Sequence, residues 1–284
     1  REIYAKCILF DYSYKFFYED GYGKDSLILN MNGEAYEQAD NARKYFTACL
    51  LSFYQQLWLW STHRDKLTDF NTEKPLWVFV GNTVSGEDSD ILEVVNFLAS
   101  FLNSDEQIKS WLADLIADRA QILDAEGNNI FGGRFTALMG FVGREDDLYA
   151  DILLRVFNAP SRQRLKLVNI SWRVSTMGLL NMGQGEGSQI IQLFGRGVRL
   201  KGKGFSLKRT LPHERPKGVH LERLETLNIF GVRASYMAAF KDYLREEGIT
   251  PSDEVLELDF PTRANLPAGQ LKTLALKDGY KDNQ

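Results

Sequence analysis

The residues best suited to chemistry lie between Gln192 and Arg199, where the sequence reads Q-x-x-G-R-x-x-R. On a predicted helix, Gln192 and Arg196 are four residues apart and Arg196 and Arg199 three, so all three side chains can share one face. A guanidinium stays charged and binds a phosphate through two parallel hydrogen bonds. Gly195 and Gly197 leave this face open to another domain or to a phosphate. The spacing favours a phosphate-binding face; a helix with two solvated arginines is the alternative.

The charge around this pattern is uneven. The whole chain has a formal net charge of −4, yet eight lysines or arginines and one acid, Glu214, lie between Arg196 and Lys217. A basic stretch within an acidic protein indicates a confined site for an anion. A solvated loop is the alternative.

Several chemistries are excluded. The sequence contains neither a G-x-x-x-x-G-K-[ST] phosphate loop nor a D-E-x-H motif for magnesium, and residues 202–206 are too short to replace the loop. Two cysteines and three histidines make neither a disulfide framework nor a zinc cluster, so we expect no metal site. A free-standing enzyme is weakly supported, because no Ser-His-Asp spacing, G-x-S-x-G elbow or convincing carboxylate pair is present.

The elements that must position the arginines follow from hydrophobic periodicity. We predict strands at 76–80, 165–170, 224–230 and 255–260, and helices at 34–66, 88–103, 105–118, 145–157, 189–193 (capped by Ser188) and 233–247. Strands that alternate with helices indicate an open α/β fold. We expect three parts: an aromatic and helical connecting segment at 1–70, an α/β domain at 71–250 and a C-terminal extension at 251–284.

The pattern at 192–199 resembles motif VI of superfamily 2 helicases. The block 171–183 that leads into it looks like a bacterial DEAD/DEAH-box family related to the Res (translocase) subunits of type III restriction enzymes. Residues 75–84 are similar to motif IV of that family, and 10–15, 200–203 and 224–232 also fit. The resemblance covers most of the chain and is most specific at 171–203.

This resemblance implies the second RecA-like domain of a helicase or translocase, a three-layer domain with a mainly parallel sheet. ATP and Mg²⁺ would be held mainly by an N-terminal RecA-like domain of the same protein. Arg196 and Arg199 would reach the γ-phosphate, Gln192 would orient them, and Gly195 and Gly178 would lie beside the nucleotide. The chain begins at Arg1 without a start methionine. We expect it to be part of a longer protein and to be inactive by itself.

The resemblance also implies contacts with a nucleic-acid backbone from loops that follow strands. The candidates are Asn82 and Thr83 after the motif IV strand, and Ser175 and Thr176 in the motif V region. Hydroxyl and amide groups suit phosphate contacts that carry no base information, although capped turns would use the same residues. Lys201, Lys203, Lys208 and Arg209 would add electrostatic contacts with the backbone, with a solvated face as the alternative. We expect DNA rather than RNA, in restriction or phage defence, where a nuclease or methyltransferase subunit is a further candidate partner.

Two other expectations complete this interpretation. No stretch approaches the roughly 20 apolar residues that cross a bilayer, so we expect a cytoplasmic protein without membrane contact. The family carries a short Glu-Gly-Trp stretch ahead of Ser-Trp-Arg, but here Ile170 is followed directly by Ser171. We expect a segment to be missing at that point. The alternative function is a non-catalytic RecA-like module that only binds nucleic acid.

Overall fold

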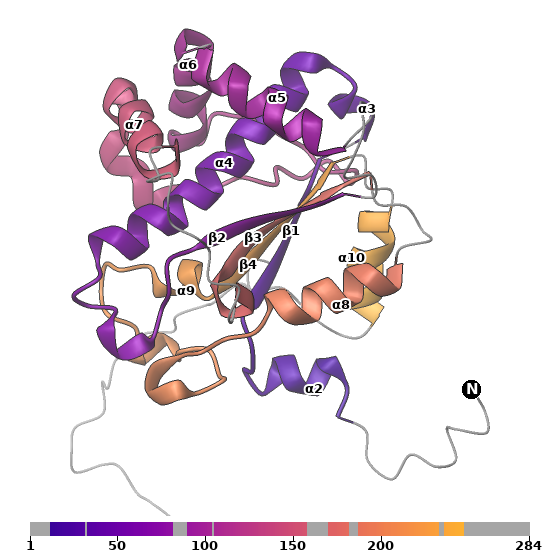
Figure 1. The fold of residues 1–284 in the computed structure, drawn as a ribbon, viewed down its shortest axis with the longest axis vertical. Coiled ribbons are helices and arrows are strands. Elements are labelled where there is room, and N and C mark those ends of the chain that lie inside the picture. Colours follow the sequence, from indigo (N-terminus) through magenta and orange to yellow (C-terminus); the bar gives the residue numbers. More distant parts are fainter. Residues whose placement is uncertain are drawn as a thin grey trace, which may run out of the picture. The chain divides into compact units, whose positions relative to one another are not determined.

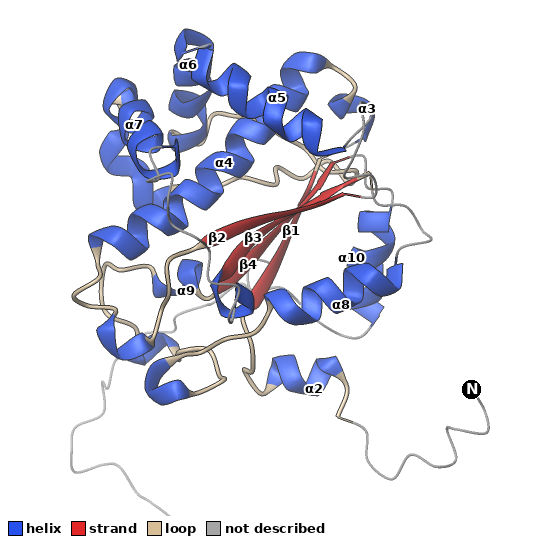
Figure 2. Ribbon diagram, in the orientation of Figure 1, coloured by secondary structure: helices blue, strands red, loops and turns tan. Residues whose placement is uncertain are grey.

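A parallel β-sheet forms the centre of the structure. The structure is a computed structural model, and it describes residues 12–31, 33–81, 90–103, 105–157, 170–181, 187–232 and 236–246. The strands are β1 (Asp25–Asn30), β2 (Leu76–Gly81), β3 (Val174–Leu180) and β4 (Thr226–Val232). Their order is β1-β4-β3-β2, and every neighbouring pair is parallel. Figures 1 and 2 show helices on both sides of this sheet. Both faces of the sheet are therefore covered, as parallel sheets require.

Four longer helices cover one face of the sheet. They are α4 (Ala39–Thr62), α5 (Asp90–Asn103), α6 (Asp105–Ile116) and α7 (Glu145–Ile152), which continues as a π-helical turn, Leu153–Phe157. The short α3 (Gly33–Tyr36) precedes α4. The Tyr45 hydroxyl of α4 donates to the carbonyls of Leu29 in β1 (2.6 Å) and Gly231 in β4 (3.0 Å). A single buried side chain thus joins α4 to two strands.

Helices α8 (Gly187–Gly197), α10 (Tyr236–Glu246) and α2 (Tyr14–Glu19) pack on the other face. Phe194 of α8 is buried between Tyr14 (ring centroids 5.3 Å apart) and Phe240 (5.2 Å), both in edge-on contact. The remaining elements are α9 (Leu221–Leu224) and the 3-10 turns Thr68–Phe70, Thr136–Phe141, Ile170–Arg173, Lys203–Phe205 and Pro212–Glu214. Helices, sheet and helices make three layers. The predicted three-layer α/β fold with a parallel sheet, of RecA-like type, is confirmed.

Residues on both sides of the proposed boundary at residue 70 share one sheet and one core. β1 pairs with β4 from Asp25↔Thr226 to Asn30↔Gly231, and side chains of α4 share the core with those of β4. The described residues before and after residue 70 therefore belong to one compact unit. The local pattern could not reveal this, because β1 gains its neighbour from a segment about 200 residues away along the chain. The predicted extension at 251–284 lies outside the described residues.

One local prediction also needs correction, and two others fall almost entirely outside the described residues. The helix predicted at 34–66 is interrupted, because Gln38 has an extended backbone (φ −83°, ψ 119°) between α3 and α4. The strand expected at 165–170 lies outside the described residues except for Ile170, which begins a 3-10 turn. This turn runs through Ser171 to Arg173, and the segment expected to be missing after Ile170 stays a prediction. The strand predicted at 255–260 also lies outside the described residues.

Candidate functional site

Helix α8 presents one polar face to solvent. Ile190 and Phe194 are buried against the sheet (1% and 5% exposed), whereas Gln192 and Arg196 are exposed. This division follows from the 3.6-residue period, which turns positions 190 and 194 inward and 192 and 196 outward. Gln192 and Arg196 therefore lie on the same solvent-facing side of a helix that the core holds in place.

Arg199 does not belong to this helix. α8 ends at Gly197, so the expected common helical face holds only for Gln192 and Arg196. Val198 and Leu200 are buried (4% and 7% exposed), and Arg199 between them is exposed. The backbone carbonyl of Val198 accepts a hydrogen bond from the amide of Lys24 (2.6 Å). Arg199 thus reaches solvent from a segment that is fixed on both sides.

The two glycines of the pattern differ from the sequence expectation. A Cβ atom on Gly195 would meet nothing within 4 Å, so this position is open, as expected. A Cβ atom on Gly197 would lie 2.8 Å from Cδ2 of Leu227 and 3.2 Å from Cε of Met177. Gly197 is therefore needed for close packing of α8 on β3 and β4, and it does not open a surface to a ligand.

Neither Arg196 nor Arg199 has a hydrogen bond or ion pair among the residues that the structure describes. Other arginines nearby are occupied. Arg209 donates to the carbonyls of Tyr18 (2.7 Å), Tyr22 and Gly23 (both 3.2 Å), and its guanidinium lies 4.3 Å from the centre of the Tyr18 ring. Arg196 and Arg199 thus retain all their donors for an external anion.

The motif V residues are not where the resemblance implied. Ser175, Thr176 and Gly178 lie inside the buried strand β3 and not in a loop after it. Thr176 is fully buried, and its hydroxyl donates to Oε1 of Gln56 (3.3 Å). A Cβ atom on Gly178 would lie 2.8 Å from the ring of Phe79. All three residues are buried in the sheet, so the loop position that the resemblance implied for them is not observed, and their contacts with nucleic acid and nucleotide stay predictions.

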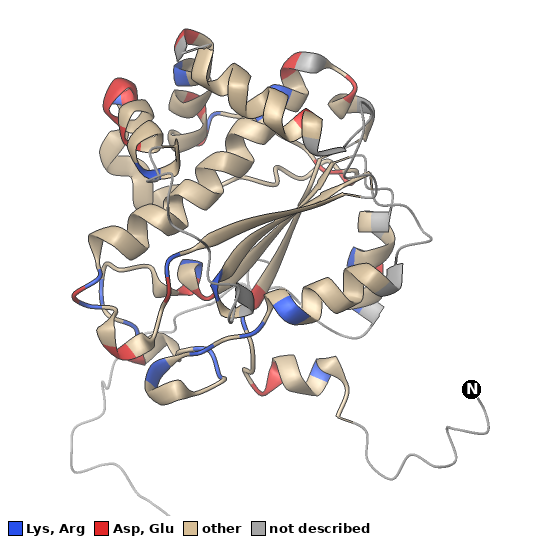
Figure 3. Cartoon of the chain, in the orientation of Figure 1, with Lys and Arg blue, Asp and Glu red and all other residues tan. Residues whose placement is uncertain are grey.

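Asn82 and Thr83, which follow β2, lie outside the described residues. Two of the remaining candidates, Lys201 and Lys203, belong to a segment that we call the basic loop, residues 199–220. Lys201 is partly exposed and Lys203 exposed. Figure 3 shows Lys and Arg positions along this loop and at the nearby end of α8. The structure thus brings these two lysines to the surface on the loop that begins at Arg199.

Residues 21–24 fasten the basic loop to the sheet. The amide of Gly23 donates to the Leu207 carbonyl (2.8 Å), and the Arg209 amide donates to the carbonyl of Gly21 (2.7 Å). The far end of the loop is held by a small core of Val219 and Leu221 with Leu67 and Phe70. The loop is therefore attached at its start, middle and end.

The sequence analysis missed a buried lysine beneath this loop. The ammonium of Lys24 donates to the carbonyls of Trp172 (3.0 Å) and Val174, and the residue is only 3% exposed. Burial lowers the pKa of Lys24 to about 7, while the nearby Glu73 carboxylate acts in the opposite direction. Lys24 joins the start of β1 to the start of β3, directly beside the carbonyl of Val198. In the sequence, the only sign that Lys24 is buried is its position just before an apolar run.

Glu225 completes this buried polar layer. Its carboxylate accepts hydrogen bonds from the amide (2.8 Å) and the hydroxyl (2.7 Å) of Thr210, and burial raises the pKa of the group. Lys24, Glu73 and Glu225 line a pocket of about 30 Å³, enough for about one water molecule. The buried polar groups support the basic loop, and the pocket between them is too small for a nucleotide.

No protein-family model, curated protein or solved structure matches the chain. Its function therefore has to be argued from its own residues. Among the helices that the structure describes, none combines the length and apolar character that crossing a bilayer requires.

Proposed function

We propose that this chain is the second RecA-like motor domain of an ATP-dependent nucleic-acid translocase or helicase. The proposal depends on one observation: Arg196 and Arg199 are exposed and unpaired within the described residues, on a helix end and a segment that the core fixes. Two exposed arginines without an internal partner add little to the stability of the folded chain. They suit a domain that supplies charge to an anion bound elsewhere.

In phosphoryl transfer, that anion would be the γ-phosphate of ATP. Negative charge develops on the transferred γ-phosphoryl group, and catalysis consists mainly of positioning and electrostatic stabilisation. ATP and Mg²⁺ would be gripped mainly by an N-terminal RecA-like domain, because this sequence lacks a phosphate loop. Arg196 and Arg199 would contact the terminal phosphate when the two domains close, with Gln192 orienting Arg196 across one turn of α8. Opening after hydrolysis would withdraw both arginines.

The test is nucleic-acid-stimulated ATP hydrolysis by a protein in which this chain is joined to its N-terminal RecA-like domain. Wild type is compared with Arg196→Ala, Arg199→Ala and a control, Arg119→Ala. Arg119 is also exposed but is paired with Asp114 (3.1 Å). We expect a large loss of turnover in the first two variants and little change in the control. Equal turnover in all four proteins would refute the proposal.

The second candidate function is a non-catalytic module that binds nucleic acid. It is favoured by the surface lysines of the basic loop on a chain without a phosphate loop. This module would bind nucleic acid with an affinity that neither ATP nor Arg196→Ala changes, whereas a motor domain changes its affinity during the ATP cycle. For either function we propose DNA rather than RNA as the nucleic acid, as the family resemblance implies.

A further inference from the structure

The tip of the basic loop carries an aromatic side chain in an unusual position. Phe205 is 68% exposed, more than any other large hydrophobic residue that the structure describes. Its backbone is left-handed (φ +63°), as is that of Gly204 before it (φ +61°). This conformation is costly for a bulky residue and inexpensive for glycine. Phe205 therefore does not pack in the core, and glycine would form this turn at a lower energetic cost.

The loop holds Phe205 firmly in this position. The amide of Gly202 donates to the Ser206 carbonyl (2.7 Å), and the Phe205 amide donates to the Gly202 carbonyl (3.1 Å). Asn71 donates its side-chain amide to the same Gly202 carbonyl (2.9 Å). Because the backbone is fixed, the ring is held outward in the folded protein before any ligand binds.

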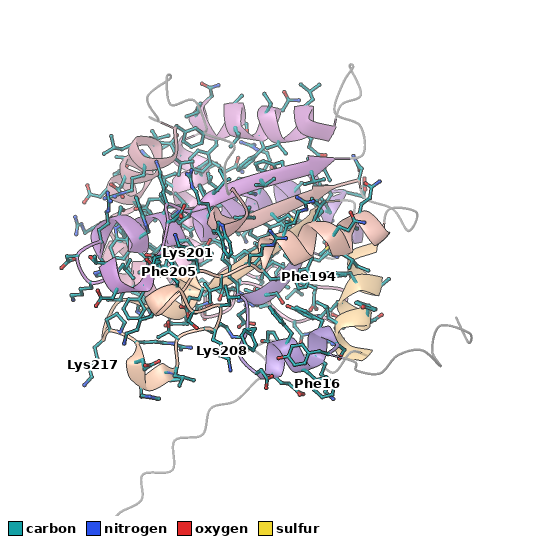
Figure 4. All side chains as sticks on the ribbon, turned by 60° about the horizontal axis from the view of Figure 1, so that its bottom comes forward. Phe16, Phe194, Lys201, Phe205, Lys208 and Lys217 are labelled. Carbon is teal, nitrogen blue, oxygen red and sulfur yellow. The ribbon has the colours of Figure 1, made fainter. Side chains whose placement is uncertain are left out.

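A positive charge lies beside the exposed ring, and others lie along the same loop. The ammonium of Lys201 lies 5.1 Å from the centre of the Phe205 ring, and Figure 4 shows these two side chains together at the surface of the loop. Lys203 is adjacent in sequence, and Lys208 and Lys217 extend from the same loop. One acid offsets them: Glu214 lies 3.9 Å from Lys203. An exposed ring among lysines matches a ligand that has flat apolar faces and a negative backbone.

We propose that Phe205 is a stacking platform for a base of single-stranded nucleic acid, with Lys201, Lys203 and Lys208 contacting its phosphates. Single strands are held in this way, by aromatic rings beneath the bases and cations along the backbone. In a duplex the bases are already stacked, so their faces are not available to the ring. The role of this stacking site in a motor rests on the proposed function. Within that function, the site specifies single-stranded nucleic acid as the form that the domain follows.

The test measures binding of the 284-residue chain to a labelled oligothymidylate and to a duplex of equal length, at low salt and without ATP. The variants are Phe205→Ala, Phe205→Trp and Phe205→Gly. Met139→Ala is the matched control, because Met139 is also a highly exposed apolar residue (58%) and lies outside the basic loop. We expect Phe205→Ala to bind the oligothymidylate about 5- to 150-fold more weakly than wild type, the range for loss of one stacked base.

Phe205→Trp should retain the affinity, and Met139→Ala should not change it. Phe205→Gly should bind as weakly as Phe205→Ala but melt at a higher temperature than wild type, because glycine accepts the left-handed backbone. This melting result separates loss of stacking from loss of folding.

Unchanged binding by Phe205→Ala would overturn the inference, as would an absence of oligothymidylate binding by the wild type. Preference for anionic phosphatidylserine vesicles over the oligothymidylate would also overturn it, by assigning the ring to a membrane surface. Because ATP is absent, none of these results depends on ATP hydrolysis. A failed stacking site and a failed motor are therefore distinguishable.

Discussion

Arginines with different roles lie close together in this chain. Arg209 is structural, because three backbone carbonyls and the ring of Tyr18 occupy its guanidinium. Arg196 and Arg199 have no partner among the described residues. The sequence analysis also expected Arg209 to contact nucleic acid, but its internal partners, which come from a segment nearly 190 residues earlier, could not be predicted.

This difference predicts effects of different size on stability. Arg209→Ala should lower the free energy of unfolding by about 1.5–3 kcal/mol, the range for hydrogen bonds to a charged group. Arg199→Ala should stay within about 0.5 kcal/mol of wild type, as exposed substitutions do. Urea unfolding of both variants measures the two values. Similar losses would show that Arg199 has a structural partner and would weaken its proposed role.

Lys24 predicts a dependence of stability on pH. Its pKa is about 7 when folded and 10.5 ordinarily, so between these values the unfolded chain binds the proton and the folded chain does not. The free energy of unfolding should therefore rise with pH across this window, by up to about 1.4 kcal/mol per pH unit from this group. Below pH 7 both states are protonated, and the cost of burying the charge is fully present.

The comparison is urea unfolding of wild type and Lys24→Met at several pH values from 7 to 10, the window set by the two pKa values. The stability difference between the two proteins should shift in favour of wild type as the pH rises, because methionine does not titrate. Groups common to both proteins, including the tyrosines, cancel in this difference. A difference that is constant with pH would contradict the lowered pKa.

At the scale of elements, the success of the sequence prediction depended on how each element is buried. β2, α5, α6 and α10 were predicted within a few residues, because each is either a short apolar run or has one apolar face. β3 was missed because Ser175, Thr176 and Gly178 interrupt its apolar character. Gln56 satisfies Thr176 inside the core, and the Phe79 ring fills the space beside Gly178. Partners of this kind cannot be inferred from the strand itself.

The packing of α8 gives a prediction with an internal control. Gly197→Ala should cost about 1–3 kcal/mol of stability, because its new methyl group meets Leu227 at 2.8 Å in a packed core. Gly195→Ala should be neutral or raise stability by up to about 1 kcal/mol, since alanine favours a helix and the site is open. Thermal unfolding of both variants is the measurement. Equal tolerance of both changes would contradict the close contact between α8 and β4.

At the scale of the whole molecule, the fold class could be predicted, but the place of β1 in the sheet could not. Alternating strands and helices indicated a parallel sheet, which the structure confirms. The assignment of β1 to that sheet depends on pairing with β4 across most of the chain, and local periodicity carries no information about it. The same long-range pairing brings residues 21–24 beneath the basic loop, so the support for Arg199 also could not be predicted.

The central claim is that this domain acts on ATP held by another domain. The most direct measurement is the turnover number of ATP hydrolysis, taken together with ATP affinity, for the joined protein carrying both Arg196→Ala and Arg199→Ala. We predict a turnover about 10³–10⁵-fold lower, the effect of an arginine finger in GTPases, with ATP binding largely retained. Turnover equal to that of the wild type would contradict the claim and leave a nucleic-acid-binding module.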